Sequence, residues 1–122
     1  MEQGPTACRG VRGAIGVDGV TVEEATRELL DALVQANGLR PQDVAAAIFT
    51  LTDDLAGENP AAAARRHGWS SVPLLVVKES GDARLERCLR VLVLWNTSVP
   101  QDRVRHVYLG RAAALRPDLV GG

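Results

Sequence analysis

The stretch Arg87–Asn96, RCLRVLVLWN, decides the fold class because its apolar run is nearly continuous. Every residue in Leu89–Trp95 except Arg90 is apolar, which predicts a β-strand covered on both faces. Residues two apart in a strand share a face, so Arg90 is expected to point the same way as Leu92 and Leu94. A guanidinium on an otherwise apolar face indicates either a structural ion pair or a binding site.

A strong helical pattern precedes this strand, in TVEEATRELLDALVQANG at residues 21–38. Thr21 is placed as an N-cap and Glu24 completes a capping box. Asn37 and Gly38 are typical of a helix end. The buried face is predicted to consist of Ala25, Leu29, Leu30, Leu33 and Val34.

Strand patterns and a second helix account for most of the remaining chain. Strands are predicted in residues 43–52, 72–79 and 102–110, with Arg105 and Tyr108 on opposite faces of the last one. Asn59 and Pro60 are placed as the N-cap and the first residue of a helix. This alternation predicts an α/β fold, with a single mixed β-sheet packed against helices.

Length, charge and composition exclude several classes of protein. The chain has 122 residues and a formal net charge of -1, so it has no general basic field for nucleic acid or an anionic membrane. No apolar run approaches the roughly 20 residues of a membrane span. The first ten residues, MEQGPTACRG, contain no apolar core of a signal peptide, so we expect a cytoplasmic protein with reduced thiols.

The usual catalytic and metal-binding patterns are not found in the sequence. Cys8 and Cys88 fit no metal motif or nucleophile motif, and both are interpreted as small buried or half-buried thiols. His67 and His106 have no carboxylate at ligand spacing, so no metal is expected. The glycines at 10, 13 and 16 do not match a nucleotide-binding loop and are interpreted as points of backbone flexibility. The aromatic residues are expected in the core or at an interface.

The remaining candidates for a functional site are charged side chains on the predicted strands. Glu79 ends the strand that precedes Arg90, so the two can form a buried ion pair that only fixes the register. They can equally line a pocket for a ligand with anionic or electron-rich oxygens, which the fork of arginine recognises well. The pattern alone leaves these two interpretations open.

Several segments resemble one known family. The segment Val99–Leu119, VPQDRVRHVYLGRAAALRPDL, closely resembles the C-terminal signature of the small trimeric α/β chorismate mutases, the AroH class. The segment Arg9–Ala14, RGVRGA, resembles the opening strand of that family, and GWSSVPLLVVKE and CLRVLVLWNT fit between them with the family's spacing. The resemblance covers residues from about Cys8 to Leu119.

The resemblance implies a fold, an assembly and an activity. It implies a single domain over residues 1–122, with an extended or disordered N-terminus at 1–7 and a mobile tail at 116–122. It implies a homotrimeric pseudo-barrel with active sites between subunits. The implied reaction is the rearrangement of chorismate to prephenate in phenylalanine and tyrosine biosynthesis, without metal or organic cofactor.

The resemblance also implies roles for individual residues. Arg90 would face the ether oxygen and a carboxylate of the substrate. Glu79 would accept a hydrogen bond from the substrate hydroxyl and would help to orient Arg90. Arg12 would contact the hydroxyl and carboxylate region, Tyr108 would bind a carboxylate, and Arg65 would come from a neighbouring subunit. The other implied substrate-binding residues are Asn59, Ala61, Leu74, Leu75, Val76, Leu115 and Arg116.

The sequence departs from the family pattern at two positions of the second helix. Asn59 stands where the best-known form has an aromatic residue, and Ala62 stands where it has a lysine. Two alternatives remain: an imine-deaminase-like enzyme of related fold, and a non-catalytic trimeric carboxylate-binding module. Arg105 and His106 belong to the signature but are interpreted as structural or interfacial.

Overall fold

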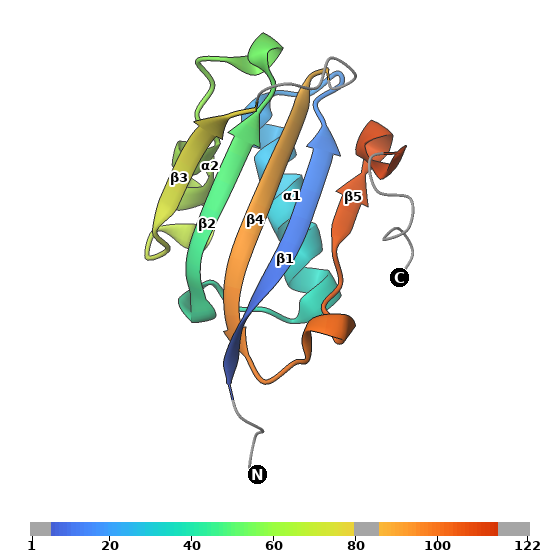
Figure 1. The fold of residues 1–122 in the computed structure, drawn as a ribbon. Coiled ribbons are helices and arrows are strands. Elements are labelled where there is room, and N and C mark those ends of the chain that lie inside the picture. Colours follow the sequence, from blue (N-terminus) through green and yellow to red (C-terminus); the bar gives the residue numbers. More distant parts are fainter. Residues whose placement is uncertain (1–5, 80–85, 115–122) are drawn as a thin grey trace.

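The computed structural model describes residues 6–79 and 86–114, which form one five-stranded mixed sheet with two helices behind it (Figure 1). The strand order is β3-β2-β4-β1-β5, which confirms the predicted fold class. β4 is antiparallel to β1 and β2, whereas β3 and β5 run parallel to β2 and β1. The tail expected at 116–122 and most of the N-terminal segment expected at 1–7 lie outside the described residues. The strands are β1 (Ala7–Gly16), β2 (Val44–Leu51), β3 (Leu74–Lys78), β4 (Cys88–Thr97) and β5 (Val107–Leu109).

Helix α1 (Val22–Asn37) begins and ends where the sequence predicts. The Thr21 hydroxyl accepts from the Glu24 backbone N–H at 3.0 Å, and the Glu24 carboxylate accepts from the Thr21 N–H at 2.9 Å. Gly38 ends the helix with a left-handed φ of 68° and donates its N–H to the Val34 carbonyl. The predicted apolar stripe packs against the sheet, with Val34 partly buried.

Helix α2 (Pro60–Ala64) is short and begins as predicted, with the Asn59 side chain accepting from the Ala62 N–H at 3.0 Å. It continues into a wider turn, η3 (Arg65–Trp69), in which Gly68 has a φ of 92°. Trp69 is buried in the core, as are Phe49 and Trp95. No helix in the described part of the chain is long and apolar enough to cross a membrane.

Strand β4 lies in the middle of the sheet, but its two faces differ. Leu89, Val91, Val93 and Trp95 pack on the helical side. On the other face, where the described residues place neither α1 nor α2, Leu92 is 39% exposed (Figure 1). The prediction that this strand is covered on both faces is therefore wrong for the single chain. An apolar run shows that a face avoids water, but it does not show which chain covers that face.

Strand β5 is shorter than the predicted strand at 102–110. Before Val107, side chains of this segment make the hydrogen bonds to β1 that a strand backbone would make. Gln101 donates to the Gly10 carbonyl at 2.8 Å and accepts from the Gly10 N–H at 3.0 Å. His106 Nδ1 accepts from the Arg12 N–H at 2.9 Å. The structural role expected for His106 is thus confirmed, whereas the placement of Arg105 on the same strand as Tyr108 is wrong.

Gly13 lies where β1 packs closely against α1 and β4, a role that the sequence interpretation as backbone flexibility did not include. A Cβ at Gly13 would meet Leu33 at 3.0 Å, Val91 at 3.1 Å and Leu29 at 3.2 Å. A Cβ at this position would therefore require the side chains of Leu29, Leu33 and Val91 to shift by a few tenths of an ångström. A Cβ at Gly16 would meet the Asp18 carboxylate at 2.9 Å.

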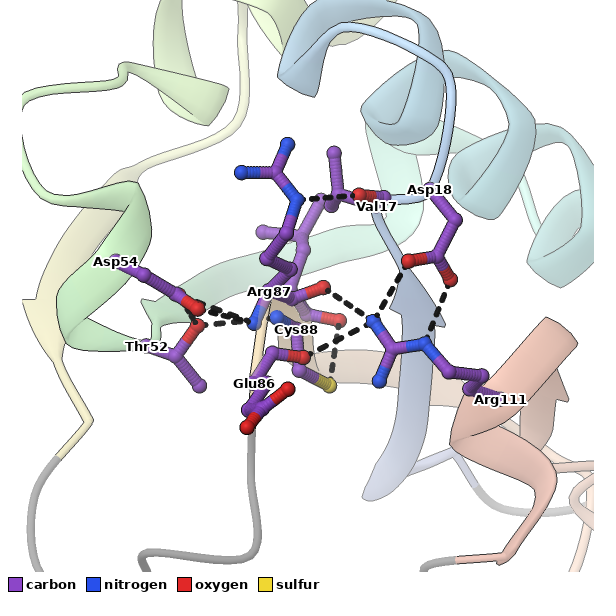
Figure 2. Close-up of polar contacts among 9 residues, drawn as sticks. Val17, Asp18, Thr52, Asp54, Glu86, Arg87, Cys88 and Arg111 are labelled. Atoms are coloured by element: carbon purple, nitrogen blue, oxygen red, sulfur yellow. Dashed lines mark hydrogen bonds and ion pairs between the residues drawn. The ribbon is translucent and has the colours of Figure 1, made fainter.

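The beginning of β4 is held by hydrogen bonds from the backbone and the side chain of Arg87 (Figure 2), a residue with a positive φ of 43°. Its N–H donates to both carboxylate oxygens of Asp54, at 3.0 and 2.9 Å, and its Nε donates to the Val17 carbonyl at 2.9 Å. The next residue, Cys88, donates its N–H to the Thr52 hydroxyl at 3.0 Å. These bonds fix the direction in which β4 leaves the loop and so fix the position of the following residues.

Arg111 ties the turn η5 (Gly110–Ala114) to the same end of the sheet (Figure 2). It donates to the Asp18 carboxylate at 2.7 and 3.0 Å and to the carbonyls of Glu86 and Arg87 at 3.0 and 3.3 Å. The hydrogen bonds from Arg111 lower the pKa of Asp18 below its usual value. Three segments that are distant in sequence are thereby joined beside the beginning of β4.

The substitution Gly13→Ala is expected to lower the free energy of unfolding by about 1–3 kcal/mol, because the added methyl group overpacks the contact with α1. Chemical denaturation measures this loss. Gly10→Ala is the matched control, since a Cβ there meets only Leu92, at 3.6 Å. Equal stability of the two variants would contradict the close approach at Gly13.

The substitution Asp18→Asn is expected to lower the melting temperature at neutral pH. A carboxyl whose pKa is lowered by folding adds stability above its unfolded pKa and loses it as the pH falls through the folded pKa. The difference between wild type and variant should therefore shrink below about pH 4. Asp53→Asn, at an exposed contact with Lys78, is the control and should change little. A difference that is constant with pH would refute the role of this ion pair.

Candidate active site

The strand register places side chains from all five strands in rows across the face that carries no helix in the described chain. One row passes through Arg90, and an adjacent row passes through Arg12. Their members alternate with core residues, so each row lies on the side opposite α1. The first row is Val77, Thr50, Arg90, Ala14 and Tyr108, and the second is Leu75, Ile48, Leu92 and Arg12.

Arg90 and Glu79 form a loose pair near the middle of the first row. Arg90 Nε lies 3.5 Å from Glu79 Oε1, and the two side chains are 37% and 23% exposed. Arg90 Nε is itself buried and has no hydrogen-bond partner among residues 6–79 and 86–114. The predicted ion pair is present, but it leaves a desolvated donor unsatisfied. A donor of this kind is costly unless a ligand satisfies it.

Glu79 is fixed by two contacts with β2. Its backbone N–H donates to the Leu51 carbonyl at 2.9 Å, and its Oε1 accepts from the Thr50 hydroxyl at 2.8 Å. Thr50 was not among the residues expected from the sequence. The available signal was a single hydroxyl in a strand whose residues on the same face, Ala46 and Ile48, are apolar.

Cys88 lies two residues before Arg90 on the same face of β4, and Tyr108 lies beyond Ala14 on β5. Cys88 is buried with Ala14 and Ala112, and Tyr108 packs half-buried against this cluster. Burial raises the pKa of the Cys88 thiol, and the nearby Arg90 charge opposes that shift. The buried state expected for Cys88 is confirmed, whereas Cys8 is exposed in the single chain because it lies near the free end of β1.

Arg12 lies diagonally across from Arg90 on the neighbouring strand, because it pairs with Leu92 in the β1–β4 register. Its exposed side chain borders a hollow of about 260 Å³ that is also lined by Gly10, Leu92, Gln101 and His106. The structure therefore brings Arg90, Glu79, Arg12 and Tyr108 to one face.

Of the other expected substrate-binding residues that the structure describes, only Leu75 lies on the face of Arg90 within one chain. Arg65, Asn59 and Ala61 belong to or flank α2, which lies behind the sheet (Figure 1). Within β3, Leu75 shares the face of Arg90, whereas Leu74 and Val76 alternate to the other side. Leu115 and Arg116 lie outside the described residues.

The described residues show no group of three or more His, Cys, Asp or Glu side chains that could hold a metal ion. His67 instead lies 2.7 Å from Asp31, where helix α1 meets η3. What the site offers chemically is a half-buried cation, a carboxylate held by β2, a second arginine and a phenol. These groups suit a ligand with several oxygens and a reaction in which charge develops on one of them.

Comparisons with known proteins agree with this geometry. The family model for chorismate mutase type I matches residues 8–119. A chorismate mutase AroH from Thermus thermophilus is 53% identical over 91% of this chain and 95% of its own length, and one from Bacillus subtilis is 40% identical over 91% of each. A solved chorismate mutase from Clostridium thermocellum is 37% identical, with a TM-score of 0.81 over 86% of this chain and 97% of that one. The chain belongs to the chorismate mutase type I family.

Proposed function

We propose that this chain converts chorismate to prephenate at the face around Arg90, by a Claisen rearrangement that uses no cofactor. Chorismate mutase activity, an isomerase activity of aromatic amino acid biosynthesis, follows from the family. The observation that carries the site assignment is the buried and unsatisfied Nε of Arg90 beside Glu79. Neither the imine-deaminase-like activity nor the non-catalytic binding module is favoured by these relatives.

The proposed mechanism needs no nucleophile and no general base. The substrate rearranges within itself once its compact conformer is held, which removes much of the entropic part of the barrier. Arg90 donates to the ether oxygen as the C–O bond breaks and stabilises the charge that develops there. Glu79 accepts a hydrogen bond from the substrate hydroxyl. Arg12 contacts the hydroxyl and carboxylate region of the substrate, and Tyr108 donates a hydrogen bond to a substrate carboxylate.

We also propose that three copies of the chain assemble through the uncovered sheet face. Leu75, Val77 and Leu92 are 62%, 43% and 39% exposed on that face, which is unusual for neighbouring apolar residues of a sheet. A neighbouring copy would cover them and bring Arg65, Asn59 and Ala61 to the site. Leu74 and Leu75 would contribute to the pocket wall, the Val76 backbone would touch the ligand, and Leu115 and Arg116 would close the pocket. The enzyme would act in the cytoplasm, which cell fractionation tests.

The substitution Arg90→Ala is expected to abolish nearly all turnover while leaving the fold intact, because it removes the charge at the breaking bond. Loss of chorismate absorbance, with prephenate confirmed as the product and no cofactor added, measures the activity. Arg90→Lys should restore little of it, since an ammonium cannot reproduce the guanidinium fork. Near-wild-type turnover of Arg90→Ala, with circular dichroism unchanged, would refute the mechanism.

The shared site is tested by mixing Arg90→Ala with Arg65→Ala. Arg65→Ala alone is expected to raise KM, so activity is measured at low chorismate concentration. If a site takes Arg90 from one chain and Arg65 from its neighbour, refolding the two together at equal amounts restores about a quarter of the wild-type activity. No recovery, with trimers of the 13.0 kDa chain seen by light scattering, would show that one chain supplies both arginines.

A further inference from the structure

Thr50 lies opposite Arg90 in the register between β2 and β4, and its hydroxyl donates to Glu79 Oε1 at 2.8 Å. The same oxygen is the one nearest to Arg90 Nε, at 3.5 Å. Glu79 Oε1 is thus contacted from β2 by a hydroxyl and from β4 by a guanidinium. The hydroxyl is within hydrogen-bonding distance and the guanidinium nitrogen is not.

The separation of 3.5 Å is unusual for an arginine and a carboxylate that are both half-buried. Such pairs ordinarily close to about 2.7–2.9 Å, because a charged hydrogen bond is strong where water is scarce. Here the backbone of Glu79 is held to Leu51 at the end of β2, and its Oε1 is held to Thr50. Both anchors lie on β2, so they hold the carboxylate on the side of β2 and away from β4.

We propose that Thr50 is a positioning residue that keeps Glu79 from closing on Arg90, so that the half-buried Arg90 guanidinium stays free to bind the substrate. This inference rests on the proposed roles of Arg90 and Glu79. With Oε1 occupied by Thr50, Glu79 Oε2 is the oxygen that accepts the substrate hydroxyl. A closed pair would neutralise the cation before the substrate arrives and would draw the guanidinium away from the breaking bond.

A plain strand-forming role does not explain a hydroxyl at this position. Ala46 and Ile48 precede Thr50 on the same face of β2, and Val77 lies next to Thr50 on β3. Valine has nearly the shape of threonine and an equal preference for strands. Packing alone would therefore be served by valine, and the hydroxyl is needed only for its contact with Glu79.

The test is a double-mutant cycle with Thr50→Val and Glu79→Gln, measured by steady-state chorismate turnover. Thr50→Val is expected to lower kcat about tenfold with KM changed less than threefold, because the loss falls on the reacting geometry. In the Glu79→Gln background, where the neutral amide does not attract Arg90, it should lower kcat less than twofold. Thr50→Ser keeps the hydroxyl and should restore turnover to within twofold of wild type.

Thr26→Val is the matched control, because it removes a buried threonine hydroxyl that bonds only within α1, to the Val22 carbonyl at 2.7 Å. It should lower the melting temperature and leave kcat and KM unchanged. A crystal structure of Thr50→Val should show Arg90 Nε within hydrogen-bonding distance of Glu79 Oε1, which gives a readout independent of activity.

The outcomes separate this inference from the proposed function. Unchanged turnover of Glu79→Gln would refute the proposed role of Glu79 itself. An impaired Glu79→Gln together with a fully active Thr50→Val would overturn the positioning role and leave the proposed function in place. An equal loss from Thr50→Val in both backgrounds would also overturn it, since that pattern belongs to a residue that acts on the fold alone.

Discussion

A guanidinium N–H that is buried without a partner costs free energy, and the sheet around Arg90 is built to keep one in that state. The central strand supplies a rigid backbone, with β1 and β2 hydrogen-bonded along its two sides. The neighbours of Arg90 in these strands are Ala14 and Thr50, and neither forms a hydrogen bond with its Nε. The unsatisfied donor therefore depends on all three central strands, and in the proposed mechanism a substrate oxygen would offset the cost.

The helices could be predicted closely because their signals are local. The capping box of Thr21 and Glu24, the left-handed Gly38 and the Asn59–Pro60 start act within a few residues of each helix end. The glycine at 13 could not be interpreted correctly from the sequence, because its reason lies in side chains of α1 and β4. The predicted length of β5 was wrong for a similar reason. The Gln101 and His106 side chains make hydrogen bonds to β1 that a longer strand would make through its backbone.

The site was predicted in part. The residues alone left open whether Arg90 and Glu79 form a structural pair or a pocket, and the family resemblance suggested the pocket. The placement of Arg90, Glu79, Arg12 and Tyr108 on one face agrees with that suggestion. The spacing between charges could not be read from any pattern, because it depends on the register of β2 against β4. Thr50 was missed for this reason, since a threonine in a strand is ordinary until its cross-strand neighbour is known.

The rows across the sheet also determine which changes of length the protein can accept. A slip of one residue in β4 would turn Arg90 toward α1 and bring Val91 to the opposite face, since strand side chains alternate between faces. An insertion or deletion inside β4 would therefore separate Arg90 from Glu79, Arg12 and Tyr108 even if the chain still folds. The connections between strands carry no such constraint, so length variation among relatives should collect in the loops. In this fold the hydrogen-bond register between the strands sets the distances between Arg90, Glu79, Arg12 and Tyr108.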